Sequence, residues 1–231
     1  MKKFVVFCIK IACAVLRPFY PVKVYGDRNI DNKKLIIVSN HISAWDPVLY
    51  QVHMKHLAPF VYKSEFLKSK FLTWVLNGLD CVPINRGEAD INATKSILRL
   101  LKDDRPIYIY PEGTRNPQID CLQEFHTGAA LFALKTKSPV RPLYIWDKAK
   151  CGHKNYIIVG DEFTLDEFYD QPLNRNTLES ATEVIKNKVD KLRVELNGIL
   201  ETKGVKRRKR TQKELEKIKT SQGEDRENLS T

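Results

Sequence analysis

The sequence predicts a single α/β domain, with a mixed β-sheet flanked by helices, preceded by a short apolar helix at the N-terminus. Short apolar runs, such as residues 35–38 and 106–110, have the length of buried strands. They alternate with longer segments whose apolar residues recur at helical spacing, a pattern typical of α/β folds. A chain of 231 residues is long enough to bury one large core of this kind.

Residues 1–20 are expected to form a membrane anchor separate from the domain. Residues 4–16 are strongly apolar and have basic neighbours, but a membrane span needs about 20 such residues. No small-residue cleavage site follows, so a signal peptide is not indicated. We therefore expect a helix that lies in the membrane interface, with Lys10 reaching the headgroups. An ordinary core helix is the alternative, although no acidic residue precedes Asp27, which favours an anionic surface.

The next segments predict strand, loop and helix in succession. Residues 22–25 are predicted as a short strand, and residues 35–38 as a buried one. Residues 48–54 are predicted to be helical, because Pro47 fixes a φ angle suited to the start of a helix. Asp46 or a neighbour is then expected to cap that helix.

The middle of the chain predicts two strands and two helices. Residues 59–62 are predicted as a strand that leads into a helix from Lys63 to about residue 76. The apolar residues of that helix recur at helical spacing and could face either the core or a bilayer. Residues 90–101 are predicted as an amphipathic helix, and residues 106–110 as a buried strand. The apolar side of the amphipathic helix is predicted to carry Ile91, Ile97, Leu98 and Leu101.

The remaining segments complete the predicted domain, which spans residues 21–202. Residues 125–137 are predicted to be helical. Residues 139–145 are predicted as a strand at a sheet edge or strand start, because proline lacks an amide donor. Residues 156–159 are predicted as a further short strand.

A final helix is predicted to reach about residue 200, opened by Ser180 and Glu183 as a capping box. Residues 203–231 are then expected to form a basic tail, disordered or loosely helical, that could contact anionic lipid.

The charge composition indicates an anionic partner. Lysine and arginine total 39 against 28 acidic residues, which gives a net charge of +11. Nucleic acid, an anionic bilayer and a phosphate-bearing substrate would each fit this charge. Hydrophobic residues make up 42% of the chain, which indicates a globular protein that is not disordered as a whole.

The cysteines and histidines do not predict a metal site. The five cysteines are odd in number and form no C-x-x-C pair, so we expect reduced, mostly buried thiols in a cytosol-facing protein. His53 and His56 lack ligands at zinc spacing and are predicted to be surface or helix-end residues. The cysteines are Cys8, Cys13, Cys81, Cys121 and Cys151.

His41 and Asp46 form the first candidate catalytic pair. They lie five residues apart in the loop after a predicted strand, where a carboxylate can fold back onto one ring nitrogen. The other nitrogen could then act as a base toward a hydroxyl. The alternative is a capping aspartate beside a hydrogen-bonded loop histidine.

A second candidate site follows the strand at residues 106–110. Glu112, Gly113, Thr114 and Arg115 bring a carboxylate, a flexible glycine, a hydroxyl and a guanidinium to one strand end. Glycine allows close approach of the backbone to a ligand. Two charged residues beside a turn glycine are unusual for a plain turn, so a functional role is favoured here.

Four sequence blocks follow one another in a fixed order. They are Asn40-His41-x-x-x-x-Asp46, an apolar stretch ending in Arg86, Tyr110-Pro-Glu-Gly-Thr-Arg115 and Pro139-Val-x-Pro142. Together they resemble the glycerolipid acyltransferase family, whose typical bacterial members are 1-acyl-sn-glycerol-3-phosphate acyltransferases. The resemblance covers about residues 20 to 165, and Asp80 stands where the family usually has glycine.

The resemblance implies acyl transfer from a thioester to the sn-2 hydroxyl of lysophosphatidic acid, which forms phosphatidic acid. His41 would be the general base and Asp46 would hold its tautomer. Arg86 and Arg115 would contact the phosphate, with Glu112 orienting one of them, while Gly113 and Thr114 shape the pocket. Lys63 would contact phosphate or the oxyanion, for which backbone amides near residues 41–46 are equal candidates.

The resemblance also implies partners and location. The co-substrate would be acyl-carrier protein or acyl-coenzyme A thioester, with no cofactor and no metal. The protein would lie at the cytoplasmic face of the cell membrane, peripheral or monotopic, on a phospholipid surface. Another lysophospholipid, glycerol 3-phosphate or a lyso-aminolipid remains an alternative acceptor. A non-catalytic protein that binds anionic membrane or nucleic acid is the alternative of another class, although nucleic acid is not expected.

Overall fold

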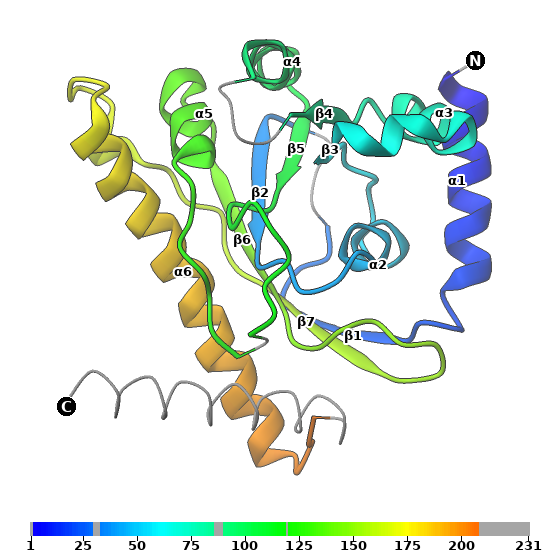
Figure 1. Ribbon diagram of the computed structural model, residues 1–231. Helices are drawn as coiled ribbons and strands as arrows, with labels where there is room; N and C mark the ends of the chain where they lie inside the picture. Colours follow the sequence, from blue (N-terminus) through cyan, green and yellow to red (C-terminus); the bar gives the residue numbers. More distant parts are fainter. Residues whose placement is uncertain (1, 30–32, 86–89, 119, 208–231) are drawn as a thin grey trace, which may run out of the picture.

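The computed structural model describes residues 2–29, 33–85, 90–118 and 120–207, and its centre is a five-stranded sheet (Figure 1). The strand order is β1-β7-β6-β2-β5; β6 and β7 are antiparallel, and the other neighbours are parallel. The predicted mixed sheet is therefore confirmed. Its strands are β1 (Val22–Tyr25), β2 (Leu35–Ser39), β5 (Pro106–Ile109), β6 (Val140–Ile145) and β7 (Asn155–Val159).

A second, two-stranded sheet extends beyond β5. It pairs β3 (Val61–Lys63) with β4 (Val82–Ile84) in parallel. A bridge between Phe60 and Tyr108 joins the start of β3 to β5 in the same direction. The carboxyl ends of β3 and β5 therefore lead toward the same edge of the molecule.

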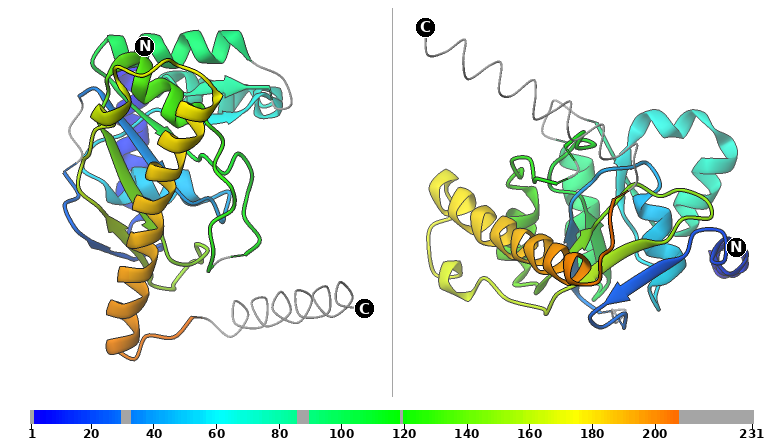
Figure 2. Two further views of the ribbon diagram at one scale, coloured as in Figure 1. Left: turned by 90° about the vertical axis from the view of Figure 1, so that its left-hand side faces the viewer. Right: turned by 90° about the horizontal axis from the view of Figure 1, so that it is seen from below.

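Helices cover both faces of the large sheet, as Figure 2 shows from two further sides. One face packs against α4 (Ile91–Lys102), α5 (Gly128–Thr136) and α6 (Arg175–Thr202). The other face is covered by α2 (Asp46–His53), with α1 (Lys2–Leu16) outside it. The predicted arrangement of one sheet between helices is confirmed.

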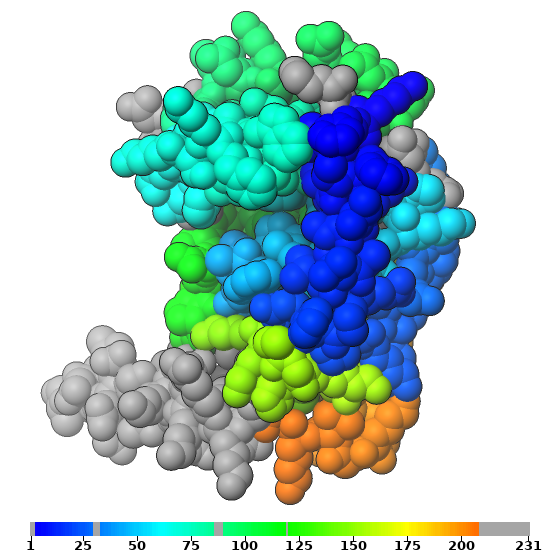
Figure 3. Space-filling view, turned by 90° about the vertical axis from the view of Figure 1, so that its right-hand side faces the viewer, coloured from blue at the N-terminus to red at the C-terminus, as the bar shows by residue number. Residues whose placement is uncertain are grey.

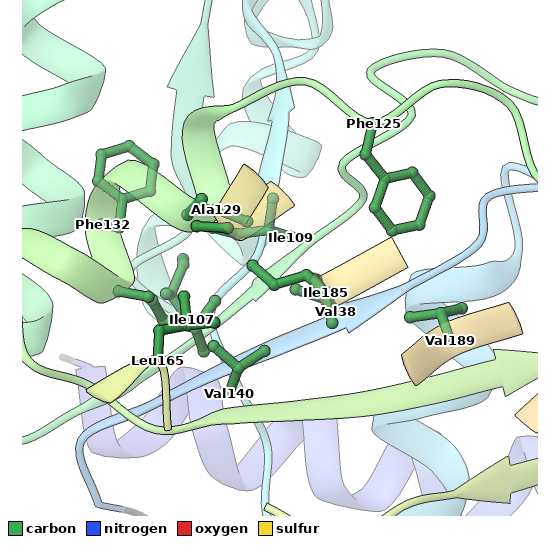
Figure 4. Packing of buried hydrophobic residues seen from close by; sticks show 14 of the residues in the cluster. Val38, Ile107, Ile109, Phe125, Ala129, Phe132, Val140, Leu165, Ile185 and Val189 are labelled. Carbon is green, nitrogen blue, oxygen red and sulfur yellow. The ribbon is translucent and has the colours of Figure 1, made fainter. Parts of the chain in front are cut away.

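Side chains of one strand contribute alternately to two cores. Ile36 and Val38 of β2 join the core under α5 and α6, part of which is shown in Figure 4. Leu35 and Ile37 join the core under α2. A strand that is covered on both faces has no polar side, which explains the unbroken apolar run in the sequence.

Strand β6 lies inside the sheet, between β7 and β2, so the edge position is wrong, whereas the predicted strand start is confirmed for Pro139. Pro139 precedes the strand, and its carbonyl accepts from the Ile36 amide. The carbonyl of Pro142 points toward β7 and accepts from the Gly160 amide. The amide hydrogen that Pro142 lacks would therefore have pointed toward β7. The register between β6 and β7 begins only at Leu143, so no hydrogen bond between the paired residues is lost.

Two predicted helices differ in the structure because side chains other than the expected ones cap them. Asn174 accepts from the Thr177 amide and begins α6, so the supposed capping box at Ser180 lies inside the helix. The helix predicted from Lys63 to residue 76 is divided by Ser69, whose hydroxyl accepts from the Leu72 amide. The two parts are η1 (Ser64–Lys68), a 3₁₀ helix, and α3 (Lys70–Gly78).

Some predicted environments were also wrong. Ile91 is 64% exposed, because the first residue of α4 extends beyond the core that the helix covers. His53 ends α2 as predicted but is buried, and its Nε2 donates to the Tyr20 carbonyl. Burial lowers the pKa of His53. Of the five free cysteines only Cys81 is buried, because several of the others lie in exposed loops or on α1.

Asp80 has a φ of +58°, a left-handed conformation that glycine adopts most readily and aspartate tolerates. This conformation gives a backbone reason for the glycine that the resemblance implies at this position. The Asp80 carboxylate lies 2.8 Å from Arg105. The departure at this position is therefore accommodated within the fold.

Candidate active site

The two candidate motifs meet because β2 and β5 are parallel neighbours. Val38 of β2 is in register with Ile109 of β5, so the loops that follow both strands leave the sheet side by side. One loop carries His41, and the other carries Glu112. Residues some 70 positions apart in the sequence are brought into direct contact in this way.

The predicted fold-back of Asp46 onto His41 is confirmed. The distance from His41 Nδ1 to Asp46 Oδ2 is 2.9 Å, and the same oxygen accepts the amides of Ile42 and Ser43 at 2.8 Å each. Among the residues that the structure describes, His41 Nε2 has no hydrogen-bond partner and stays available to a substrate. Nδ1 donates its proton to the carboxylate, which leaves Nε2 as the acceptor nitrogen.

Asp46 does not cap helix α2, which corrects the expectation from the sequence. It is the first residue of the helix, and its carboxylate turns back into the preceding loop instead. The side chain is fully buried, and this burial raises the pKa of Asp46. Hydrogen bonds from His41 and the two amides oppose that rise. The carboxylate thus fixes both the imidazole and the loop.

Glu112 holds the backbone of His41, and it does not orient an arginine among the described residues. One of its carboxylate oxygens accepts the His41 amide at 3.0 Å, and the other accepts the Gln123 amide at 3.2 Å. Burial raises the pKa of Glu112, and these amides oppose the rise. The carbonyl of His41 in turn accepts from the Asn116 amide at 2.6 Å.

The imidazole ring of His41 is also held through its face. It stacks on Tyr110 with a centroid distance of 4.2 Å, and Tyr110 in turn packs against Tyr108. The Tyr108 hydroxyl lies 2.8 Å from the hydroxyl of Ser39, at the end of β2. Tyr110 therefore restricts rotation of the ring away from Asp46.

Gly113 adopts a φ of +65°, and a Cβ placed there would lie 2.5 Å from Cδ2 of His126. The glycine was predicted to allow a close ligand; the neighbour that approaches it in the structure is His126. Thr114 and Arg115 follow as exposed residues, so their hydroxyl and guanidinium are accessible from solvent.

Replacing Gly113 by alanine is expected to lower activity about tenfold, because the new Cβ displaces His126 beside the exposed residues of the loop. The positive φ alone should cost about 1 kcal/mol of stability. Gly152→Ala is the matched control, because Gly152 has a φ of +72° and no atom within 4 Å of the added Cβ. Thermal unfolding and the rate of the reaction should be compared among the wild type and the two variants. Recovery of the rate in Gly113→Ala/His126→Ala would show that the steric clash with His126 causes the loss. An unchanged rate in Gly113→Ala would contradict it.

The other two residues predicted to bind the substrate, Lys63 and Arg86, have no described contact with the His41 loop. Lys63 is the last residue of β3 and is half-buried. The residue before β3, Phe60, forms a bridge with Tyr108 of β5. Arg86 lies outside the described residues. Within the ranges that the structure describes, no group of three or more His, Cys, Asp or Glu side chains could hold a metal ion.

Sequence analysis missed the residues that support the pair. Asn40 binds Ile145 of β6 through both atoms of its amide, at 2.9 and 2.8 Å. Two more lie in the segment after Arg115: Asn116 donates to the His41 carbonyl, and His126 lies against Gly113. Adjacency to the motifs was a signal for Asn40 and Asn116, whereas His126 lies 11 positions beyond Arg115 and had none.

Three comparisons place the chain among known proteins. Residues 21–146 match the family model described as acyltransferase. A 1-acyl-sn-glycerol-3-phosphate acyltransferase from Borreliella burgdorferi is 31% identical over 155 residues, which cover 65% of this chain and 60% of that protein. The Bacillus subtilis protein of the same name is 22% identical over 84% of this chain and 98% of its own length.

A solved structure is also similar. The crystal structure of the 1-acyl-sn-glycerophosphate acyltransferase PlsC from Thermotoga maritima aligns with a TM-score of 0.61 and 25% identity, covering 83% of this chain and 79% of that one. The match spans 60% of the Borreliella burgdorferi protein and 44% of the chloroplast protein from Brassica napus, which is less than two thirds of either relative.

Proposed function

This chain belongs to the acyltransferase family, and from this premise we propose that it transfers a fatty acyl group from a thioester to the sn-2 hydroxyl of 1-acyl-sn-glycerol 3-phosphate, forming phosphatidic acid. The names of several relatives support this acceptor. The observation that carries the proposal is the 2.9 Å contact between His41 Nδ1 and Asp46, which leaves Nε2 to accept a proton.

The proposed reaction needs no covalent enzyme intermediate. His41 Nε2 takes the proton of the sn-2 hydroxyl while the hydroxyl oxygen bonds to the thioester carbonyl carbon. The tetrahedral intermediate then collapses with cleavage of the C–S bond, and the leaving thiolate takes the proton from the imidazolium. Asp46 stabilises the imidazolium between these steps. The co-substrate is acyl-coenzyme A or acyl-carrier protein, with no further cofactor.

We propose that the ammonium group of Lys63 stabilises the developing oxyanion. Most amides of the loop at residues 41–46 already donate within the protein, including those of Ile42 and Ser43 to Asp46 and that of His41 to Glu112. The amides of Trp45 and Asp46 donate to Ser43. The Lys63 ammonium would supply a donor without breaking any of those hydrogen bonds.

The acceptor phosphate is proposed to bind to Arg115, with Arg86, Thr114 and the loop at Gly113 completing its pocket. The Arg115 guanidinium is exposed directly after the loop that holds His41. A guanidinium can donate two parallel hydrogen bonds to one phosphate group. Arg115 would therefore fix the acceptor while its hydroxyl meets His41.

The test is acyl transfer by the purified full chain in detergent micelles. Lysophosphatidic acid would be offered with acyl-coenzyme A and, separately, with acyl-carrier protein. Phosphatidic acid formed with either donor supports the proposal and identifies the thioester. Glycerol 3-phosphate, a lyso-aminolipid and a lysophospholipid with a larger headgroup would be offered in parallel. Turnover of one of these, with none of lysophosphatidic acid, would overturn the proposed acceptor.

We propose that residues 1–20 anchor the domain at residues 21–202 to the cytoplasmic face of the cell membrane, and that the basic charge of segment 203–231 adds attraction to anionic lipid. Phe4 and Phe7 on α1 are 64% and 60% exposed, and Ile11 and Val15 continue the same face. Nothing in the described chain forms a helix with the length and hydropathy of a membrane span.

The apolar surface continues beyond α1. Figure 3 shows α1 as a ridge with η1 and α3 beside its upper part. Phe66, Phe71 and Trp74 are exposed there. On the opposite side of α1, Val5 is buried against Gly78 of α3, which holds the helices together. An exposed apolar face on a chain with a net charge of +11 fits the interface of an anionic leaflet.

The variant Phe4→Ser/Phe7→Ser is expected to lower binding to anionic vesicles by at least tenfold, because it removes two large apolar groups from the membrane-facing side. Cosedimentation with phosphatidylglycerol-rich vesicles is the measurement. Val194→Ser is the control, since Val194 is 58% exposed on α6, away from this face. Equal binding of the wild type and the double variant would show that α1 is not the anchor.

A further inference from the structure

Arg207 is the last described residue and belongs to the basic run at 206–210, yet its side chain is only 8% exposed. Its guanidinium lies over the ring of Trp146, 4.5 Å from the centroid, and donates to the Trp146 carbonyl. Its Nη2 is 2.9 Å from Asp120 Oδ1. A buried guanidinium with stacking, carbonyl and carboxylate partners is held in place, unlike a solvated tail residue.

Through Asp120, Arg207 reaches the segment that supports the backbone of His41. Asp120 is followed by Cys121, whose carbonyl accepts from the Asn116 side chain at 2.8 Å. The Asn116 amide donates to the His41 carbonyl at 2.6 Å. Arg207 is thus connected to His41 through three hydrogen bonds and the peptide bond between Asp120 and Cys121.

Helix α6 reinforces this connection. Arg193 Nη1 donates to the carbonyl of Asp120 at 3.0 Å. The side-chain amide of Asn197 donates to Asp120 Oδ1 at 3.1 Å, and its oxygen accepts from the indole of Trp146 at 2.9 Å. Arg207 therefore closes a polar cluster that links α6, the segment after Arg115 and the end of β6.

A second connection runs through Trp146. This residue directly follows Ile145, whose amide and carbonyl are both bound by the Asn40 side chain. Asn40 is the residue before His41. The contacts of Arg207 therefore approach His41 from two sides, through its carbonyl and through its preceding residue.

We infer that Arg207 is a positioning residue for the reaction: it fixes the two segments that set the place of the His41 backbone. This inference rests on the proposed function. A displacement of about 1 Å in a reacting group can cost about 10²-fold in rate. The basic run would therefore do more than attract anionic lipid, because Arg207 supports the loop that carries His41.

The variant Arg207→Ala is expected to lower kcat about tenfold with little change in KM for lysophosphatidic acid, since the acceptor pocket keeps its residues. Arg207→Lys should recover part of kcat, because lysine keeps the charge but not the planar, stacked contact. Lys206→Ala removes the same charge from an exposed neighbour and should leave kcat unchanged. Asp120→Ala should reproduce the fall, and the double variant should be no worse than either single one.

All rates should be measured in neutral detergent micelles and on anionic vesicles. A fall confined to vesicles, or an equal fall in Lys206→Ala, would overturn the inference and assign Arg207 to lipid contact. Hydrogen exchange of residues 40–43 and 120–123 should be faster in Arg207→Ala. If the wild type makes no phosphatidic acid, the proposed function fails, and this exchange still tests the link. Unchanged exchange would overturn it independently of activity.

Discussion

Substitution of His41 by alanine is expected to lower phosphatidic acid formation by about three orders of magnitude, while the chain stays folded. A positioned general base contributes about 10²–10⁴-fold to rate, and no other described imidazole contacts Asp46. The loss should appear in kcat, because alanine removes the proton acceptor and leaves Arg115 in place. Initial rates with saturating lysophosphatidic acid would measure it.

The variant Asp46→Asn tests whether the negative charge of the Asp46 carboxylate is needed for the reaction. Asparagine can still accept one or two of the three hydrogen bonds, but it cannot stabilise a charged imidazolium. We expect a loss of about 10²-fold or more. His56→Ala is the control, because His56 lies outside the site. Full activity in His41→Ala, with correct folding shown by circular dichroism, would refute the mechanism.

Arg115→Ala is expected to raise KM for lysophosphatidic acid about 10- to 100-fold, because a charge-assisted hydrogen bond contributes about 1.5–3 kcal/mol. KM for the thioester should change little. Arg115→Lys should lose part of this affinity, since an ammonium cannot form the paired contact. Arg99→Ala, which removes an exposed arginine from α4, is the matched control.

The acceptor itself supplies a second test of Arg115. With a lysophospholipid whose phosphate carries a large headgroup, the difference between wild type and Arg115→Ala should shrink, because the phosphate has one fewer free oxygen. A fall in kcat with unchanged KM would instead place Arg115 at the reacting centre and contradict a role in binding.

Local sequence patterns predicted secondary structure and side-chain contacts correctly where these depend on only a few neighbouring residues. The strand at Val22–Tyr25 and the fold-back of Asp46 onto His41 both lie within a handful of residues. Composition and order of motifs were also sufficient for the mixed sheet between helices. In each case the information is contained in spacing, apolar content and chain stiffness.

Outcomes that depend on distant partners could not be predicted in this way. Pro142 sits inside the sheet because its missing amide falls beyond the last residues paired with β7. Glu112 binds two backbone amides instead of an arginine, because β2 and β5 are neighbours in the folded chain. Neither fact has a local signature in the sequence.

The sequence by itself determined the fold class and the pairing of His41 with Asp46, because short-range geometry and apolar periodicity fix both. Only the tertiary structure decided how that pair is held. The contacts of Glu112 and Asn116 with His41, and of Arg207 with Asp120, join residues that are about 70 to 90 positions apart. Such contacts exist only after the sheet has brought the strand ends together, since hydrogen-bond partners are chosen by proximity in space.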